Sequence, residues 1–145
     1  QAGLLTGLQK YSKQKIRQRS STPKWQVLNN ALMSACYRKS FKDIKNDNEL
    51  WGRFVESAVG SSLSNSIKGK NIELYYWVGF NREVDFILSN GKKLVAIEVK
   101  SGRDKNNTGI ELFSKHFNVY KKILTGESGV QLADFLLIPP EKWFD

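Results

Sequence analysis

A β-hairpin between residues 83 and 100 is the strongest structural signal in this sequence. The runs Glu83–Leu88 and Lys93–Lys100 are expected to form two strands. Between them, Asn90-Gly91 is a typical hairpin turn. One face of the two strands is expected to be entirely apolar and consists of Val84, Phe86, Leu88, Val95, Ile97 and Val99. Such a face must be covered, so we expect a sheet with helices packed against it.

The opposite face of the hairpin carries charged residues. A two-residue turn places Asp85 opposite Ala96, and a four-residue loop places Asp85 opposite Glu98. In either register Asp85, Glu98 and Lys100 project from one side of the sheet, because directly opposed residues and residues two apart share a face. A three-residue loop would break this arrangement.

Two carboxylates and a lysine beside a packed apolar layer are costly to desolvate unless they pair or bind a cation. A divalent cation would remove this cost, since Mg²⁺ prefers carboxylate oxygens and takes only one or two of them from a protein. A lysine beside such a metal can position or deprotonate a water while the metal polarises a phosphodiester. The alternative is a salt-bridged surface ladder, because Glu-x-Lys on a strand is common by chance.

The rest of the chain alternates strands and helices. We expect strands at 4–11, 24–28 and 72–78, helices at 29–37, 49–63 and 111–124, a linker at 41–48, and a short helix stopped by Pro139-Pro140. In the helix over 49–63, Glu56 lies at the border of the apolar face and can point along the edge of the core. The order predicts an α/β fold with a central mixed β-sheet flanked by helices.

Charge is distributed unevenly along the chain. Residues 1–45 carry ten Lys or Arg and one acid, whereas residues 46–145 carry thirteen of each sign. Such asymmetry favours contact with nucleic acid or another polyanion, and the alternative is a solvated Lys-rich face without a partner. The candidate nucleic-acid-binding residues are Lys10, Lys13, Lys15, Arg17, Arg19 and Lys24. Trp25, next to this stretch, is the tryptophan most suited to base stacking.

Composition excludes several classes of protein. The single cysteine, Cys36, rules out an internal disulfide, fits a cytoplasmic location and is expected to pack on an apolar helix face. The single histidine, His116, rules out a histidine-rich zinc cluster and is expected at the surface or the core edge. No apolar run is long enough to span a membrane, and no secretory signal peptide is found. Trp143, near the end of the chain, is a candidate contact for partner domains or subunits.

The pattern of Glu56, Asp85 and Glu98-Val99-Lys100 resembles the PD-(D/E)xK, restriction-endonuclease-like superfamily. More closely, the chain resembles a C-terminal domain of unknown function that follows the ATPase module in many predicted bacterial and archaeal AAA+ ATPases. The matching stretches are LLTGLQKYS, SSTPKWQVLNNAL, WGRFVESAV, LYYWVGFNREVDFIL, VAIEVKSG and DFLLIPPEKWF. They are spread over nearly the whole chain.

The resemblance implies one nuclease-like domain over residues 1–145, with a basic N-terminal portion at 1–45 and a core with the acidic cluster at 46–145. It implies that Asp85 and Glu98 bind Mg²⁺ or Mn²⁺. It also implies catalytic roles for Lys100, which would orient or activate the attacking water, and for Glu56, which would assist from its helix. Val84 departs from the pattern, because it stands where the superfamily has Pro.

The resemblance further implies Mg²⁺-dependent DNA binding or cleavage. The chain has no G-x-x-x-x-G-K-[ST] motif, so ATP would bind only to the N-terminal ATPase module of the same protein, before Gln1. The expected partners are nucleic acid and that module, with self-association left open and no membrane. The alternative function is a non-catalytic DNA- or protein-binding module that organises the ATPase.

Overall fold

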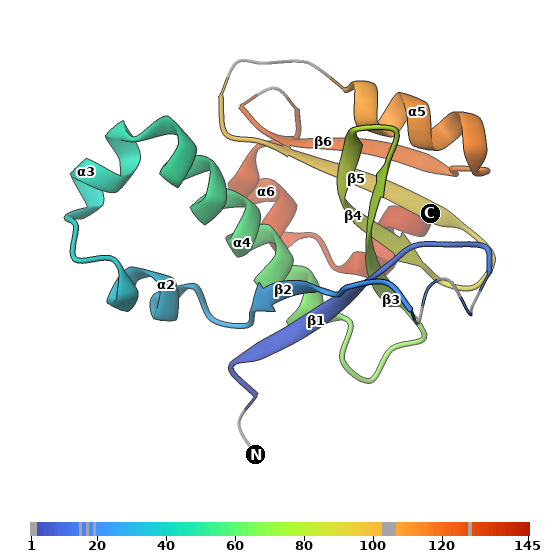
Figure 1. The fold of residues 1–145 in the computed structure, drawn as a ribbon, viewed down its shortest axis with the longest axis horizontal. Coiled ribbons are helices and arrows are strands. Elements are labelled where there is room, and N and C mark those ends of the chain that lie inside the picture. Colours follow the sequence, from blue (N-terminus) through green and yellow to red (C-terminus); the bar gives the residue numbers. More distant parts are fainter. Residues whose placement is uncertain (1–2, 15, 17, 19, 103–106, 128) are drawn as a thin grey trace.

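The structure is a computed structural model that describes residues 3–14, 16, 18, 20–102, 107–127 and 129–145. Within these ranges the chain forms a six-stranded mixed sheet with α-helices on both faces (Figure 1). The strands are β1 (Leu5–Lys10), β2 (Lys24–Val27), β3 (Glu73–Gly79), β4 (Arg82–Ser89), β5 (Leu94–Lys100) and β6 (Lys121–Gly126). The helices are α2 (Asn30–Cys36), α3 (Phe41–Asn46), α4 (Asn48–Ser66), α5 (Thr108–His116), α6 (Leu132–Leu137) and the 3₁₀ helix η1 (Pro140–Phe144). The predicted α/β class is confirmed.

The strand order across the sheet is β2-β1-β3-β4-β5-β6. Strands β3, β4 and β5 form an antiparallel meander, which contains the predicted hairpin. On one side β1 pairs parallel to β3, and β2 pairs antiparallel to β1 at the edge. On the other side β6 pairs parallel to β5 after the chain crosses over through α5.

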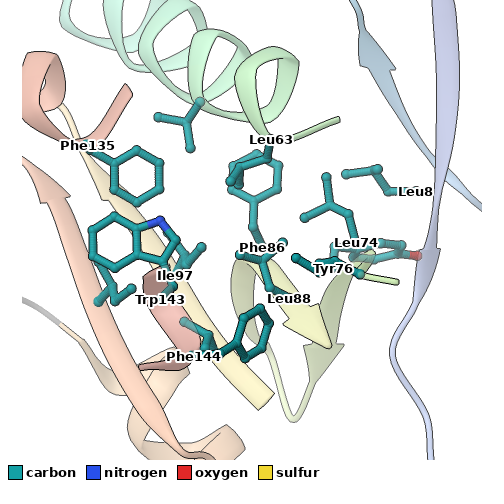
Figure 2. Packing of buried hydrophobic residues seen from close by; sticks show 14 residues of the cluster. Leu8, Leu63, Leu74, Tyr76, Phe86, Leu88, Ile97, Phe135, Trp143 and Phe144 are labelled. Atoms are coloured by element: carbon teal, nitrogen blue, oxygen red, sulfur yellow. The ribbon is translucent and has the colours of Figure 1, made fainter. Parts of the chain in front are cut away.

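Two apolar layers hold the helices on the sheet. Helices α4, α6 and η1 cover one face, where Phe86 and Ile97 from the sheet meet Leu63 of α4 and the stacked rings of Phe135 and Trp143 (Figure 2). The α5 helix covers the other face with its buried side chains Ile110 and Phe113. Burial on both faces explains why the strands of the meander are nearly continuous apolar runs.

Helix α4 matches the predicted helix and extends it to residue 66. The Asp47 carboxylate caps its first turn by accepting the Leu50 N–H, and Phe54, Val55 and Val59 are buried. The preceding segment, predicted as a linker, instead forms α3. The reason is local: Ser40 and Asp43 form a reciprocal capping box, which stabilises the first turn of a short helix.

The predicted helix at 111–124 is wrong in its second half. Helix α5 begins earlier and ends at His116, and residues 121–126 form β6 along β5. Ile123 and Thr125 alternate into the core there, so pairing with β5 outweighs the helical pattern. At the chain end, α6 stops at Leu137 before Pro139-Pro140, as expected.

Two expectations about single side chains are also corrected. Trp143 was a candidate for partner contacts, but η1 buries it against Phe135, so its exposed fraction is only 8%. Cys36 was expected to pack on an apolar face, but α2 buries no residue and the thiol is exposed. His116 is exposed, as predicted.

Candidate functional site

The hairpin between β4 and β5 closes with a four-residue loop. Ser89 pairs with Leu94 and Phe86 with Ile97, so the next pair in this register places Asp85 opposite Glu98. The Asn90 side-chain oxygen accepts the N–H groups of residues 92 and 93 at 3.1 and 2.8 Å, which folds the loop back on itself. Gly91 adopts a φ of 83°, a value that favours glycine. The second of the two predicted registers is therefore the one observed.

A bulge in β4 lies directly at Asp85. On the β3 side, Tyr75 pairs with Ile87 and Trp77 with Val84, so two residues of β4 oppose one residue of β3. The bulge turns Val84 toward the α5 side of the sheet, where it packs with Trp77. The prediction that Val84 shares a face with Phe86 is therefore wrong, because strict alternation fails at a bulge.

Three of the predicted site residues line one pocket of about 250 Å³: Asp85, Glu98 and Lys100. The walls of this pocket come from two further places, the β3–β4 turn and the first turn of α5. These walls are formed by Asn81, Arg82, Glu83, Thr108 and Gly109. Gly109 is required here, since a Cβ atom would overlap the carbonyl oxygen of Glu83. The absence of a side chain brings the start of α5 close to the carboxylates.

Glu98 and Lys100 form a close ion pair inside the pocket. The Lys100 Nζ lies 2.8 Å from Glu98 Oε1, and the two side chains are only 17% and 12% exposed. The second carboxylate oxygen, Glu98 Oε2, is buried and has no hydrogen-bond partner among the described residues. A buried acceptor without a donor is costly, so Oε2 is suited to receive a cation or a donor from outside the chain.

The pKa of Asp85 is raised to about 7, and burial is the largest cause. The negative charge of Glu56 is the second cause, while Glu98 adds a smaller effect in the same direction. A hydrogen bond from the Val99 N–H to Asp85 Oδ2, 2.8 Å long, and the positive charge of Lys24 oppose the shift. Asp85 thus lies near enough to Glu56 for their charges to interact.

Glu56 itself is paired with a lysine from the sheet edge. The Lys24 Nζ lies 2.7 Å from Glu56 Oε1 and 2.6 Å from Glu83 Oε1. Burial alone would lower the pKa of Lys24, but Glu56 and then Glu83 outweigh burial and raise the pKa. Glu56 and Lys24 line a neighbouring hollow of about 400 Å³, together with the exposed Trp25. Glu83 lines both cavities.

The predicted nucleic-acid residues are only partly described. Lys10 is half-buried at the end of β1, and Lys13 is exposed with its Nζ 5.5 Å from the centre of the Phe117 ring. Lys24 takes part in the two ion pairs given above. Lys15, Arg17 and Arg19 lie outside the described residues.

Sequence reasoning missed Glu83 as a member of the site. It precedes Asp85 by two positions on the same strand, so the alternation rule that grouped Glu98 with Lys100 could have included it. The contribution of Gly109 was also missed. Glycine is needed at this position only because α5 packs closely on β4, and no local sequence pattern indicates that contact.

The ligand atoms that the pocket offers are the carboxylate oxygens of Asp85 and Glu98. They suit a small, hard cation better than a transition metal held by many ligands. Within the described ranges, no group of three or more His, Cys, Asp or Glu side chains is arranged to hold a metal ion. Mg²⁺ commonly takes one or two protein carboxylates and keeps several waters. Asp85 and the unpartnered Glu98 Oε2 fit that pattern.

Comparisons with known proteins give one match. A protein-family model described as "Domain of unknown function (DUF4143)" matches residues 51–139. The matched segment includes Glu56, Asp85, Glu98 and Lys100. No curated protein and no solved structure matches the chain. No helix among the described residues is long and apolar enough to cross a membrane.

Proposed function

We propose that this chain, which belongs to the DUF4143 family, is a nuclease-like domain that acts on nucleic acid with the help of Mg²⁺ or Mn²⁺. The observation that carries the proposal is the pocket in which Asp85, Glu98 and Lys100 meet. A mixed sheet with helices on both faces and an acidic pocket beside one hairpin supports the restriction-endonuclease-like fold that the sequence pattern suggests.

Each residue of the pocket has a chemical role in this proposal. Asp85 and Glu98 would hold the cation, which supplies charge stabilisation and polarises a phosphodiester when bound. Lys100 would orient or activate the water, since its Nζ lies within the pocket and is held by Glu98. Glu56 would act through its charge, because it raises the pKa of Asp85 and is itself paired with Lys24.

The wider setting of the domain belongs to the same proposal. We place it beside an N-terminal ATPase module of the same protein, in the cytoplasm, with ATP bound by that module and not by these residues. Lys10, Lys13 and Lys24, together with Lys15, Arg17 and Arg19, would contact phosphates without sequence preference. Each contact with duplex DNA should then contribute about 0.9 to the slope of log affinity against log salt.

A second candidate function is a module that binds nucleic acid or a protein partner without cleaving it. The observation that favours it is the double ion pair of Lys24, which bridges Glu56 and Glu83 from within the chain. With these carboxylates satisfied internally, the cluster could serve the fold alone.

Two measurements separate the candidates. Titration calorimetry of Mn²⁺ should show binding to the wild type and none to Asp85→Ala, while the exposed control Asp134→Ala should bind as the wild type does. A plasmid-nicking assay in Mg²⁺ or Mn²⁺ should show cleavage that Asp85→Ala abolishes. If the wild type binds no Mn²⁺ and nicks no plasmid, the cluster is a salt-bridge ladder and the nuclease proposal fails.

A further inference from the structure

The turn between β3 and β4 exposes the ring of Phe80 to solvent, and its backbone there adopts an unfavourable conformation. Phe80 and Asn81 both adopt left-handed backbone angles, with φ values of 51° and 57°. Such angles suit a two-residue hairpin turn, but Asn and Gly usually occupy them and a bulky residue is disfavoured. Phe80 is nevertheless 74% exposed, so burial of the ring does not offset the strain.

The Phe80 ring stacks on a second aromatic ring, that of His116. The His116 imidazole, at the end of α5, stacks on the Phe80 ring with centres 5.2 Å apart and planes within 10° of parallel. The turn therefore lies against α5, as the ribbon also shows (Figure 1). Stacking restrains the ring in one orientation while most of its surface stays in contact with water.

The turn that carries Phe80 leads into the acidic pocket. The next two residues in the chain, Asn81 and Arg82, line that pocket with Asp85 and Glu98. Arg82 is exposed and adds a positive charge to the wall of the pocket. A nucleic-acid strand whose phosphate reaches the pocket would contact Arg82, and its path along α5 would lead toward Phe80 and His116.

We infer that Phe80, backed by His116, is a stacking platform for one unpaired nucleobase. In a duplex both faces of each internal base are covered, so an isolated exposed ring can stack only on a base that is single-stranded or at a frayed end. The site therefore selects single-stranded segments and tolerates any base, since every base offers a π-face. The inference rests on the proposed function only for the statement that a phosphate enters the pocket. The stacking of a base on Phe80 does not depend on it.

The test measures stacking without metal and without cleavage. A thymidine oligonucleotide of about 12 nucleotides, within the usual range for single-strand binding sites, carries 2-aminopurine at its centre. Binding to the 145-residue chain in EDTA is followed by anisotropy, and stacking by quenching of the 2-aminopurine fluorescence. Phe80→Leu keeps an apolar side chain but removes the ring, and Phe80→Trp keeps a ring.

The matched control is Phe41→Leu, because Phe41 is 69% exposed but lies on α3, where it lines a different cavity. Stacking on one base is worth about 5-fold to 150-fold in affinity. We expect Phe80→Leu to weaken binding by that factor and to abolish quenching, while Phe80→Trp and Phe41→Leu keep both. A blunt duplex of the same length should bind all four proteins equally.

Three results would overturn the inference: no binding of the oligonucleotide by the wild type, equal quenching by the wild type and Phe80→Leu, or loss of binding that Phe41→Leu reproduces. Failure of the nuclease proposal gives a different pattern, because Mn²⁺ binding and plasmid nicking would then be absent while quenching by Phe80 persists. If instead the wild type binds no oligonucleotide and a protein partner is lost with Phe80→Leu, the ring is a protein contact and the inference is wrong.

Discussion

Replacing Asp85 by Asn should stabilise the metal-free protein while removing its affinity for Mn²⁺. Asn has the shape of a protonated Asp, and its side-chain oxygen can still accept the Val99 N–H. The substitution therefore removes only the buried negative charge. A carboxylate that destabilises the fold is expected where function requires the charge.

The size of the effect follows from the pKa of Asp85, which is raised from 3.8 to about 7. Each unit of pKa difference corresponds to about 1.4 kcal/mol, so ionising Asp85 in the folded protein costs at most about 4 kcal/mol. Relaxation around the charge lowers this figure, and we expect Asp85→Asn to gain about 1–4 kcal/mol above pH 7. For a chain of this length that is a rise in Tm of roughly 3–12 °C.

The effect must also depend on pH in a defined direction. Between pH 4 and pH 7 the folded protein keeps the Asp85 proton while the unfolded chain releases it, so rising pH destabilises the folded wild type. Asp85→Asn does not titrate. The stability difference between the two proteins should therefore be smallest near pH 4, grow through pH 7 and then level off.

Thermal unfolding in EDTA at several pH values measures this difference, with Asp134→Asn as an exposed control expected to change stability by less than about 0.5 kcal/mol. Adding Mn²⁺ at about 100 times its dissociation constant should stabilise the wild type by about 2.7 kcal/mol and leave Asp85→Asn unchanged. The reasoning is refuted if Asp85→Asn is less stable than the wild type at pH 8, or if the difference between them does not vary with pH.

Three further substitutions test the neighbourhood of Asp85. Lys100→Ala frees Glu98 from its ion pair, so calorimetry should give an equal or slightly tighter Mn²⁺ affinity. Plasmid nicking should fall by about 100-fold or more, and weaker metal binding would contradict the role assigned to Lys100. Gly109→Ala places a Cβ atom on the Glu83 carbonyl and should lower the free energy of unfolding by about 1–3 kcal/mol, whereas Gly3→Ala should be neutral in the same denaturant titration. Lys24→Met removes the internal cation, so Mn²⁺ affinity should rise several-fold, and an unchanged affinity would show that Lys24 does not compete with the metal.

Much of the fold was predictable because local patterns and tertiary packing agree. The Asn90-Gly91 turn and the apolar runs around it predicted the β4–β5 hairpin, and its charged face brought Asp85, Glu98 and Lys100 together. The apolar stripe of α4 likewise predicted that helix and placed Glu56 at its border. In α4 the periodicity of the sequence is the periodicity of the buried surface, whereas the hairpin was indicated chiefly by its turn.

One failure was local, since the capping box of Ser40 and Asp43 makes the predicted linker a helix. The other failures depend on contacts distant in sequence. Residues 121–126 continue the helical pattern of α5, but their backbone pairs with β5 instead. Val84 lies on the opposite face of the sheet from the predicted one because β4 has a bulge, and the pairing of β4 with β3 sets the position of that bulge. Lys24 was expected to bind phosphate, and no local pattern indicates that it reaches Glu56 on α4 and Glu83 on β4 from the edge strand β2. Its role toward nucleic acid stays a prediction.

The charges around the pocket lead to a last prediction. Four carboxylates, of Glu56, Glu83, Asp85 and Glu98, face three cations, of Lys24, Lys100 and Arg82, which leaves a charge of −1 when all are ionised. This negative charge attracts a divalent cation, but Asp85 must first lose its proton. Because its pKa is about 7, Mn²⁺ binding should release about 0.9 proton at pH 6 and about 0.1 at pH 8.

Calorimetry in two buffers with different heats of ionisation measures the released protons directly. The observed heat should differ between the buffers at pH 6 and converge at pH 8. Lys24→Met should shift this dependence to higher pH, since the positive charge of Lys24 helps Asp85 to ionise. Equal heats in both buffers at pH 6 would mean that Asp85 is already ionised or does not bind the metal, and the electrostatic account of the pocket would be wrong.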